Sequence, residues 1–228
     1  MCGRFTLTRV DEVLTFFELN ERPELEVRYN IAPSQDVLVV LPPAEGPRMA
    51  RFMKWGLIPH FSRSSDLSSF INARSETVDR KLSFRDSFRS RRCLIPSDGF
   101  YEWRRERGFK QPFHFRLKDR ELFSFAGLWD RWLNEAGESI ETCTILTTPP
   151  NDLVAGMHDR MPAILDRSML DLWLDAASSP ARLKEMLGPF PSRQMEKVPV
   201  NPAVNRTDFD SSECLDPPPR RPRNLDLF

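Results

Sequence analysis

The sequence lacks several features that would place the protein in a membrane, outside the cell or around a metal ion. No apolar run approaches the ~18 residues of a membrane-spanning helix, and the N-terminus lacks the apolar segment of a signal peptide. Three histidines, at positions 60, 114 and 158, are too few and too far apart for a metal cluster. No C-x-x-C spacing, as in disulfide frameworks and zinc sites, occurs among Cys2, Cys93, Cys143 and Cys214. We therefore expect an intracellular, cytoplasmic protein with reduced thiols and neither a metal nor a small-molecule cofactor.

Excess charge is also absent. The chain has 33 Lys and Arg against 33 Asp and Glu, and this balance argues against coating nucleic acid by bulk electrostatics. Local charge differs, because eleven basic residues stand against six acidic ones between Arg74 and Lys110. This regional excess predicts either a phosphate-facing patch or a solvated surface of salt bridges.

Length and composition indicate one globular domain. The chain has 228 residues, of which 40% are hydrophobic and 29% charged, enough to bury a single core. No internal repeat or long interior linker divides it, so we place one domain at residues 2–207. The Pro/Arg-containing stretch 208–228 has no periodicity and is predicted to be a flexible tail. Leu225 and Phe228 at its end leave open a second role, docking one helical turn onto a partner.

Hydrophobic periodicity predicts more strands than helices. Pro33 biases its neighbour toward extended geometry, so residues 29–33 are predicted to form a loop. One predicted helix seats Phe84 and Phe88 on the core and presents Arg85, Arg89 and Arg92 outward. The helices are expected at 9–19, 83–91, 167–176 and 181–187, and the strands at 37–41, 51–58, 93–95, 100–103, 112–117, 122–129, 140–147 and 195–200. This pattern indicates an α+β protein with a strongly bent or barrel-like sheet and flanking helices.

The most distinctive chemistry belongs to Cys2, directly behind the initiator methionine. Cysteine is small enough for Met1 to be trimmed, which leaves a free α-amine and a thiol on adjacent carbons. These groups titrate near ~7.7–8.0 and ~8.5, so part of each is nucleophilic at neutral pH. Towards an aldehyde, the amine can form an imine and the thiol can then close a thiazolidine ring. Cys2 is therefore a candidate nucleophile, although many proteins carry a cysteine at position 2 without any such role.

Two further residues have the chemistry of proton transfer. Glu102 stands between Tyr101 and Trp103, and a carboxylate flanked by aromatics is predicted to be desolvated, with a raised pKa that suits a general acid or base. His158 follows a predicted strand and titrates near neutrality. The alternatives are a surface glutamate on an alternating strand and an ordinary loop histidine.

Seven short signatures follow one another along the chain. They are Met1-Cys2-Gly3-Arg4-Phe5, Tyr29-Asn30-x-Ala32-Pro33, Trp55-Gly56-Leu57-x-Pro59, Asn72-Ala73-Arg74-x-Glu76-Thr77, Arg92-Cys93 through Glu102-Trp103, Ala126-Gly127-Leu128-Trp129 and His158-x-Arg160-Met161-Pro162. In this order they resemble the SRAP family, the SOS-response-associated peptidase-like proteins. The resemblance runs from Cys2 to about Val204.

The resemblance implies a single SRAP-type domain that senses abasic sites in single-stranded DNA. It implies that the processed Cys2 attacks the sugar aldehyde and ends as a thiazolidine, a covalent DNA–protein crosslink that shields the lesion in the DNA damage response. The other catalytic positions it implies are Asn72, Glu102 and His158. The predicted DNA-binding residues are Arg4, Asn30, Pro33, Trp55, Arg74, Arg85, Thr147 and Arg160. We expect a monomer that works in the cytoplasm, at the nucleoid if the source is bacterial.

Two other functions remain open at this stage. Cys2, His158 and Asn72 have the residue types of a cysteine-peptidase triad, which would cleave peptides in general or only its own Met1-Cys2 bond; a lyase-type activity is a further option. A non-covalent single-strand DNA-binding module would instead use the arginine-rich helix and aromatic stacking.

Overall fold

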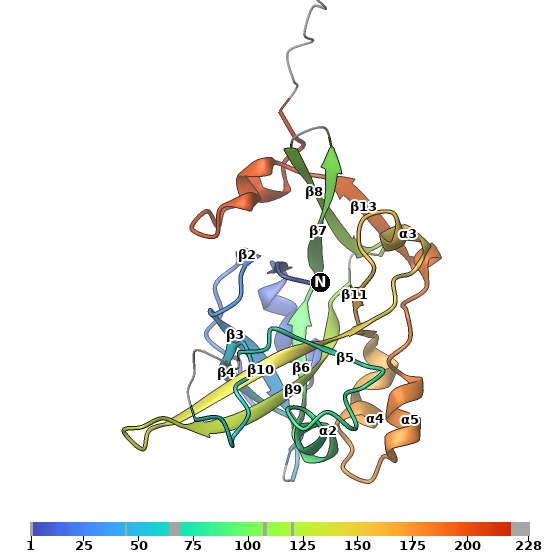
Figure 1. Ribbon diagram of the computed structural model, residues 1–228. Helices are drawn as coiled ribbons and strands as arrows, with labels where there is room; N and C mark the ends of the chain where they lie inside the picture. The colour runs from blue at the N-terminus through green and yellow to red at the C-terminus, as the bar shows by residue number, and fades with distance from the viewer. Residues whose placement is uncertain (1, 44, 64–68, 107–108, 120, 220–228) are drawn as a thin grey trace, which may run out of the picture.

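The amino-terminal strand lies between β7 (Gly99–Glu106) and the edge strand β2 (Arg28–Ile31) in an antiparallel five-stranded sheet (Figure 1). The computed structural model describes all residues except 1, 44, 64–68, 107–108, 120 and 220–228. The strand order is β13 (Met195–Pro199), β8 (Phe109–Leu117), β7, β1 (Phe5–Leu7) and β2. The predicted loop at 29–33 was wrong for residues 29–31, which belong to β2 with Ile31 paired to Phe5 of β1, and right for Ala32 and Pro33, because Pro33 restricts only the residue before it.

The second sheet closes on itself. Its order is β11 (Met161–Pro162), β10 (Ser139–Thr148), β4 (Met49–Trp55), β3 (Asp36–Leu41), β6 (Arg92–Ser97), β9 (Phe123–Leu133) and β12 (Ile164–Leu165). Because β10 pairs with both β4 and β9, strands β10, β4, β3, β6 and β9 form a ring. Only β4 and the short β5 (Asn72–Arg74) run parallel to β10 among the described pairings. The predicted bent, mostly antiparallel and barrel-like sheet is confirmed.

Short helices flank the sheets. The α-helices are α1 (Val13–Phe16), α2 (Arg85–Ser90), α3 (Asp152–Ala155), α4 (Leu170–Leu174) and α5 (Pro180–Glu185). The 3-10 helices are η1 (Val10–Glu12), η2 (Arg167–Met169), η3 (Ser192–Gln194), η4 (Pro202–Asn205) and η5 (Ser212–Leu215). Side-chain caps begin several of them, as where the Asn151 side chain accepts hydrogen bonds from Leu153 N and Val154 N at the start of α3. None of the helices in the described part of the chain is long and apolar enough to cross a membrane.

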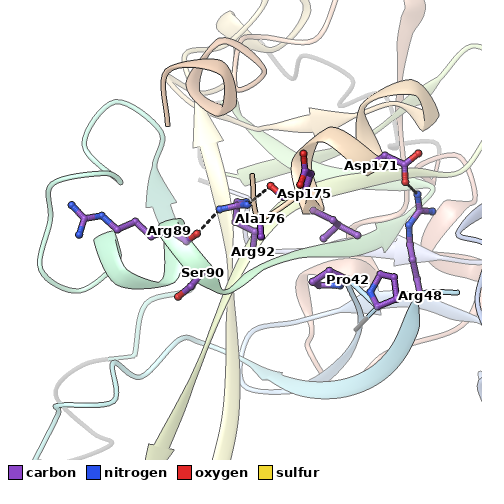
Figure 2. Close-up of a pocket in the computed structure, with 10 residues that line it drawn as sticks. Pro42, Arg48, Arg89, Ser90, Arg92, Asp171, Asp175 and Ala176 are labelled. Carbon is purple, nitrogen blue, oxygen red and sulfur yellow. Dashed lines mark hydrogen bonds and ion pairs between the residues drawn. The ribbon is translucent and has the colours of Figure 1, made fainter. Parts of the chain in front are cut away.

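Arg92 joins two of these helices from inside the protein. Its guanidinium donates to the carbonyl oxygens of Phe88 and Arg89 at the end of α2 and of Trp173 and Asp175 at the end of α4, at 2.7–2.8 Å. Figure 2 shows the hydrogen bonds to Arg89 and Asp175. The prediction that Arg92 faces outward was wrong, because the residue begins β6 after the helix has ended and is only 4% exposed. Helix carboxyl ends carry partial negative charge, so they stabilise a buried cation.

We expect Arg92→Met to lower the free energy of unfolding by about 3 kcal/mol, because four buried carbonyl oxygens lose their donor. Chemical denaturation measures the change. The matched control is Arg89→Met, which removes an exposed side chain but keeps the carbonyl, and it should change stability by less than about 0.5 kcal/mol. Equal losses in the two variants would contradict this role of Arg92.

Residues 208–216 pack on the domain. Cys214 of η5 is buried in a small second core with Tyr101, Val200 and Val204. The prediction of a flexible tail from Asp208 is therefore contradicted for residues 208–216, because a few apolar residues and the carboxylate of Asp210 hold this segment on the domain. Leu225 and Phe228, proposed as a docking turn, lie outside the described residues.

Candidate active site at the amino terminus

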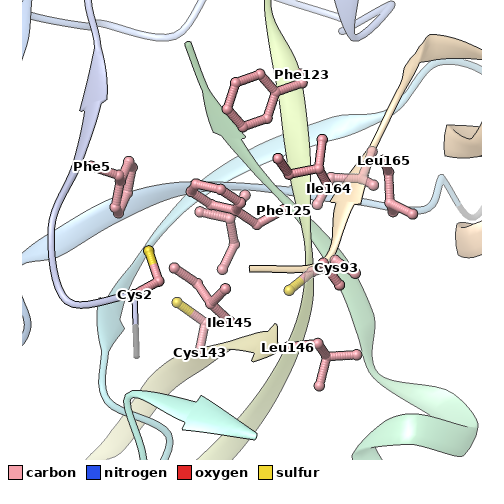
Figure 3. Close-up of a cluster of buried hydrophobic side chains, with 14 of the residues drawn as sticks. Cys2, Phe5, Cys93, Phe123, Phe125, Cys143, Ile145, Leu146, Ile164 and Leu165 are labelled. Atoms are coloured by element: carbon pink, nitrogen blue, oxygen red, sulfur yellow. The ribbon is translucent and has the colours of Figure 1, made fainter. Parts of the chain in front are cut away.

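Cys2 lies just before β1, with its side chain in the main core. The residue is fully buried, and Figure 3 shows its sulfur among Phe5, Phe125 and Ile145. Burial raises the pKa of the Cys2 thiol far above its usual range, and the negative charge of Glu102 raises it further. The thiol is therefore neutral at pH 7, so it needs a base before it can attack an electrophile.

Asn72 holds the backbone of Cys2 in place. It is the first residue of β5, which pairs with β10 at Ile145, and its Nδ2 donates to the carbonyl oxygen of Cys2 at 2.9 Å. Its Oδ1 is buried and has no hydrogen-bond partner in the part of the chain that the structure describes. This amide thus fixes the Cys2 peptide and offers an acceptor beside it.

Glu102 reaches the same place from β7. Phe5 pairs with Phe100 and Tyr101 N donates to Arg4 O at 3.0 Å, so the antiparallel register carries Glu102 to a position opposite residue 3. The glutamate is 3% exposed, and burial raises its pKa to about 7. At neutral pH it is part acid and part carboxylate, the state that suits proton transfer in both directions.

The raised pKa has a different cause from the one the sequence suggests. Tyr101 and Trp103 belong to the small second core, on the opposite face of β7 from Glu102. Glu102 shares its face with Phe100, which enters the main core. The flanking aromatics therefore do not desolvate the carboxyl group, and the main core does.

His158 lies between α3 and β11. Its Nδ1 accepts a hydrogen bond from Arg160 N at 3.0 Å and lies 2.8 Å from an Asp159 carboxylate oxygen. These contacts need opposite protonation states of Nδ1. Burial lowers the pKa of His158, which favours the neutral ring; when Nδ1 accepts the hydrogen bond from Arg160 N, the proton of that ring lies on Nε2. The charge of Asp159 also helps to raise the pKa of Glu102, so the His158–Asp159 turn faces the same site.

Arg74 is the predicted DNA-binding residue best placed for that role. It lies two residues after Asn72 on β5, so both side chains leave the strand on one face, and Arg74 is exposed. No ion pair of Arg74 occurs within the described portion of the chain. Pro33 is half-buried between β2 and β3, and DNA contact by it stays a prediction.

Three side chains predicted to line a DNA groove face inward instead. Trp55 is fully buried, donates from Nε1 to Ile71 O at 2.9 Å and packs edge-on against Phe5. Asn30 is fully buried among backbone carbonyls, and Thr147 is 1% exposed on β10. Burial leaves these side chains almost no exposed surface in this structure, and DNA contact by them stays a prediction.

The remaining predicted arginines differ in placement. Arg160 is committed to a bidentate ion pair with Glu76, at 2.5 and 2.8 Å, and to Thr147 O, so it braces the loop rather than offering a free charge. Arg4 donates to Asn30 Oδ1 and to Val204 O. Arg85 lies on α2, apart from the amino terminus (Figure 1), and the structure does not bring it to the site.

One supporting residue, Asp98, received no role from the sequence. Its carboxylate accepts hydrogen bonds from Thr6 Oγ1, Thr8 N, Thr8 Oγ1 and Arg9 N, at 2.5–3.0 Å. It thereby anchors the far end of β1. The only sequence signal was its place before Gly99, in a turn between two predicted strands.

The fold and this arrangement together define a class of protein: a barrel-like α+β domain whose candidate nucleophile lies beside its own amino terminus. A family model described as SOS response associated peptidase (SRAP) matches residues 1–207, and the chain belongs to this family. The chain is 39% identical over 223 residues to the abasic site processing protein YoaM of Bacillus subtilis (strain 168), covering 95% of this chain and 98% of that protein.

More distant relatives support the same family assignment. The abasic site processing protein HMCES of Gallus gallus is 33% identical over 195 residues, covering 75% of this chain and 58% of that protein. A crystal structure of a protein from Bacteroides thetaiotaomicron has a TM-score of 0.86 at 27% identity and covers 95% of this chain and 99% of that one. The resemblance drawn from the seven signatures is confirmed.

Proposed function

We propose that this protein processes abasic sites in single-stranded DNA and forms a covalent thiazolidine crosslink through Cys2 after Met1 is removed. One observation carries the proposal: a buried cysteine next to the amino terminus, held by Asn72 and coupled to a carboxyl group whose pKa is about 7. Family membership and the names of the relatives support the same substrate. We further propose that it acts as a monomer, in the cytoplasm or at the nucleoid.

The chemistry balances without a cofactor. The Cys2 amine adds to the aldehyde carbon of the ring-opened sugar, and loss of water gives an imine. The thiol then adds across the C=N bond, forming the S–C bond and passing its proton to nitrogen. One aldehyde and one aminothiol thus become one thiazolidine and one water.

Glu102 is the group suited to move these protons. As the neutral acid it protonates the departing oxygen, both when the sugar ring opens and when water leaves the adduct. As the carboxylate it then takes the proton of the Cys2 thiol. Asn72 positions the Cys2 peptide, and the neutral His158 supplies a second proton donor at Nε2.

Two alternatives predict different products. A cysteine peptidase using Cys2, His158 and Asn72 would cleave peptides, or only its own Met1-Cys2 bond, and a lyase would cut the DNA strand. A non-covalent binding module would leave both molecules unchanged. Intact mass after incubation with abasic single-stranded DNA, undamaged DNA and a peptide library separates these cases. An adduct that forms only with abasic DNA supports the proposal, and unchanged masses in every mixture contradict it.

We expect Arg74→Ala to weaken binding to single-stranded DNA on all sequences alike, because a phosphate contact carries no base information. The logarithmic salt slope of affinity should fall by about one, as expected for the loss of one phosphate contact. Fluorescence anisotropy over a salt series measures both. The matched control is Arg85→Ala, which removes another exposed arginine away from the site and should leave affinity and slope unchanged. Equal slopes for wild type and Arg74→Ala would remove Arg74 from the binding surface.

A further inference from the structure

Residues 201–216 cross the outer face of the five-stranded sheet, and we call them the C-terminal strap. Figure 1 shows this segment near β2 and β8, above the amino terminus. Its apolar residues, Val204, Phe209, Cys214 and Leu215, pack against Tyr101 of β7. Asn205 Oδ1 accepts a hydrogen bond from Trp103 Nε1 at 2.6 Å, and Asn201 N donates to Asp216 O, which ties the two ends of the strap together.

The strap also covers the edge strand β2. The carboxylate of Asp210 accepts hydrogen bonds from Tyr29 N at 2.6 Å and Asn30 N at 2.9 Å, and it pairs with Arg28. Two amides that would otherwise lie unpaired at a sheet edge are thereby satisfied. The buried Asn30 of β2 also holds the strap, because its Nδ2 lies within hydrogen-bond distance of Val204 O, Arg206 O and Phe209 O.

Arg4 connects the strap to the nucleophile. Its Nη1 donates to Val204 O at 2.8 Å, across 200 residues of sequence, and to Asn30 Oδ1 at 2.9 Å. Arg4 is two residues from Cys2, and its carbonyl oxygen accepts from Tyr101 N. A displacement of the strap would therefore move the segment that carries Cys2.

We propose that the C-terminal strap positions the amino-terminal nucleophile against Glu102, with Asp210, Asn30 and Arg4 as positioning residues. The proposal deepens the proposed function and rests on it. The strand β7 makes the coupling direct, because Tyr101 and Trp103 touch the strap on one face while Glu102 enters the site on the other. The C-terminal strap thus supports both reacting groups: the backbone before β1, which carries Cys2, and β7, which carries Glu102.

Asp210→Ala tests this assignment. At saturating abasic DNA we expect the crosslinking rate to fall about tenfold, because a small misplacement of reacting groups costs rate even when binding is intact. Affinity for a tetrahydrofuran analogue, which has no aldehyde and cannot crosslink, should stay within about twofold because the phosphate contacts are untouched. Amide hydrogen exchange at residues 3–7 and 28–31 should speed up about tenfold.

Two variants sharpen the result. Asp208→Ala removes a carboxylate in the same strap that pairs with the exposed Arg206 and, among the described residues, with no group of the sheet, and it should match wild type in every measurement. Asp210→Asn keeps an oxygen acceptor and should recover most of the rate. A wild-type rate in Asp210→Ala, or unchanged exchange at residues 3–7, would overturn the proposal. If wild type itself forms no adduct, the proposed function fails, and exchange alone then supports or overturns the strap.

Discussion

Cys2→Ala should abolish the stable adduct with abasic single-stranded DNA. The variant keeps the amine but has no thiol, so an imine formed on the sugar cannot close to a thiazolidine and hydrolyses back. Affinity for the DNA should stay within about threefold, because the exposed Arg74, the proposed phosphate contact, remains. Denaturing gel electrophoresis measures the adduct, and anisotropy with the tetrahydrofuran analogue measures the affinity.

Cys2→Ser is the matched control, because it keeps the amine and replaces sulfur with oxygen. Borohydride should trap its imine as a stable amine, and the same should hold for Cys2→Ala. A heat-stable adduct formed by Cys2→Ala at wild-type yield without borohydride would refute the proposed chemistry. If neither variant gives a trapped species while wild type does, the amine is not the first nucleophile.

Glu102→Gln should slow crosslinking by ~10²–10⁴-fold, the usual contribution of general acid–base catalysis. The amide keeps the size and most of the hydrogen bonding of the acid but can neither give nor take a proton. Single-turnover rates across pH provide the measurement. In wild type the rate should change around pH 7, the pKa of Glu102, and this inflection should be missing in the variant. A normal rate in the variant on a ring-closed abasic site would show that ring opening does not depend on Glu102.

Stability gives a second reading of the same substitution. The folded-state pKa of Glu102, about 7, lies above the ordinary value of 4.5, so this group's contribution is complete below pH 4.5 and is lost as pH rises through 7. Above pH 7, burying the carboxylate costs on the order of 3 kcal/mol. Glu102→Gln should therefore be more stable than wild type at pH 8 and nearly equal at pH 4. If the substitution raises the stability and lowers the crosslinking rate, Glu102 serves the reaction rather than the fold.

The local pattern of the chain predicted most of the strands and helices, because apolar periodicity reports which side of each element is buried. It failed where burial came from distant segments. Residues 28–31 pair with β1, and the end of α4, about eighty residues away, helps to enclose Arg92, so part of what buries each position is distant in the sequence. The stretch after Asp208 looked unstructured because its partners, Tyr29, Asn30 and Tyr101, lie more than a hundred residues away.

By itself the sequence determined the chemistry of this protein: a cysteine behind the initiator methionine, with an amide, a carboxyl and an imidazole in ordered signatures. The type of a side chain sets what it can donate, accept or attack, and this does not require a fold. Only the tertiary structure decided which polar residues face the solvent. Asn30, Trp55 and Thr147 turned inward, and Arg74 stayed exposed beside Asn72. The reason is that alternation along a strand separates its two faces but does not say what covers each face. Here the C-terminal strap covers one face of β7.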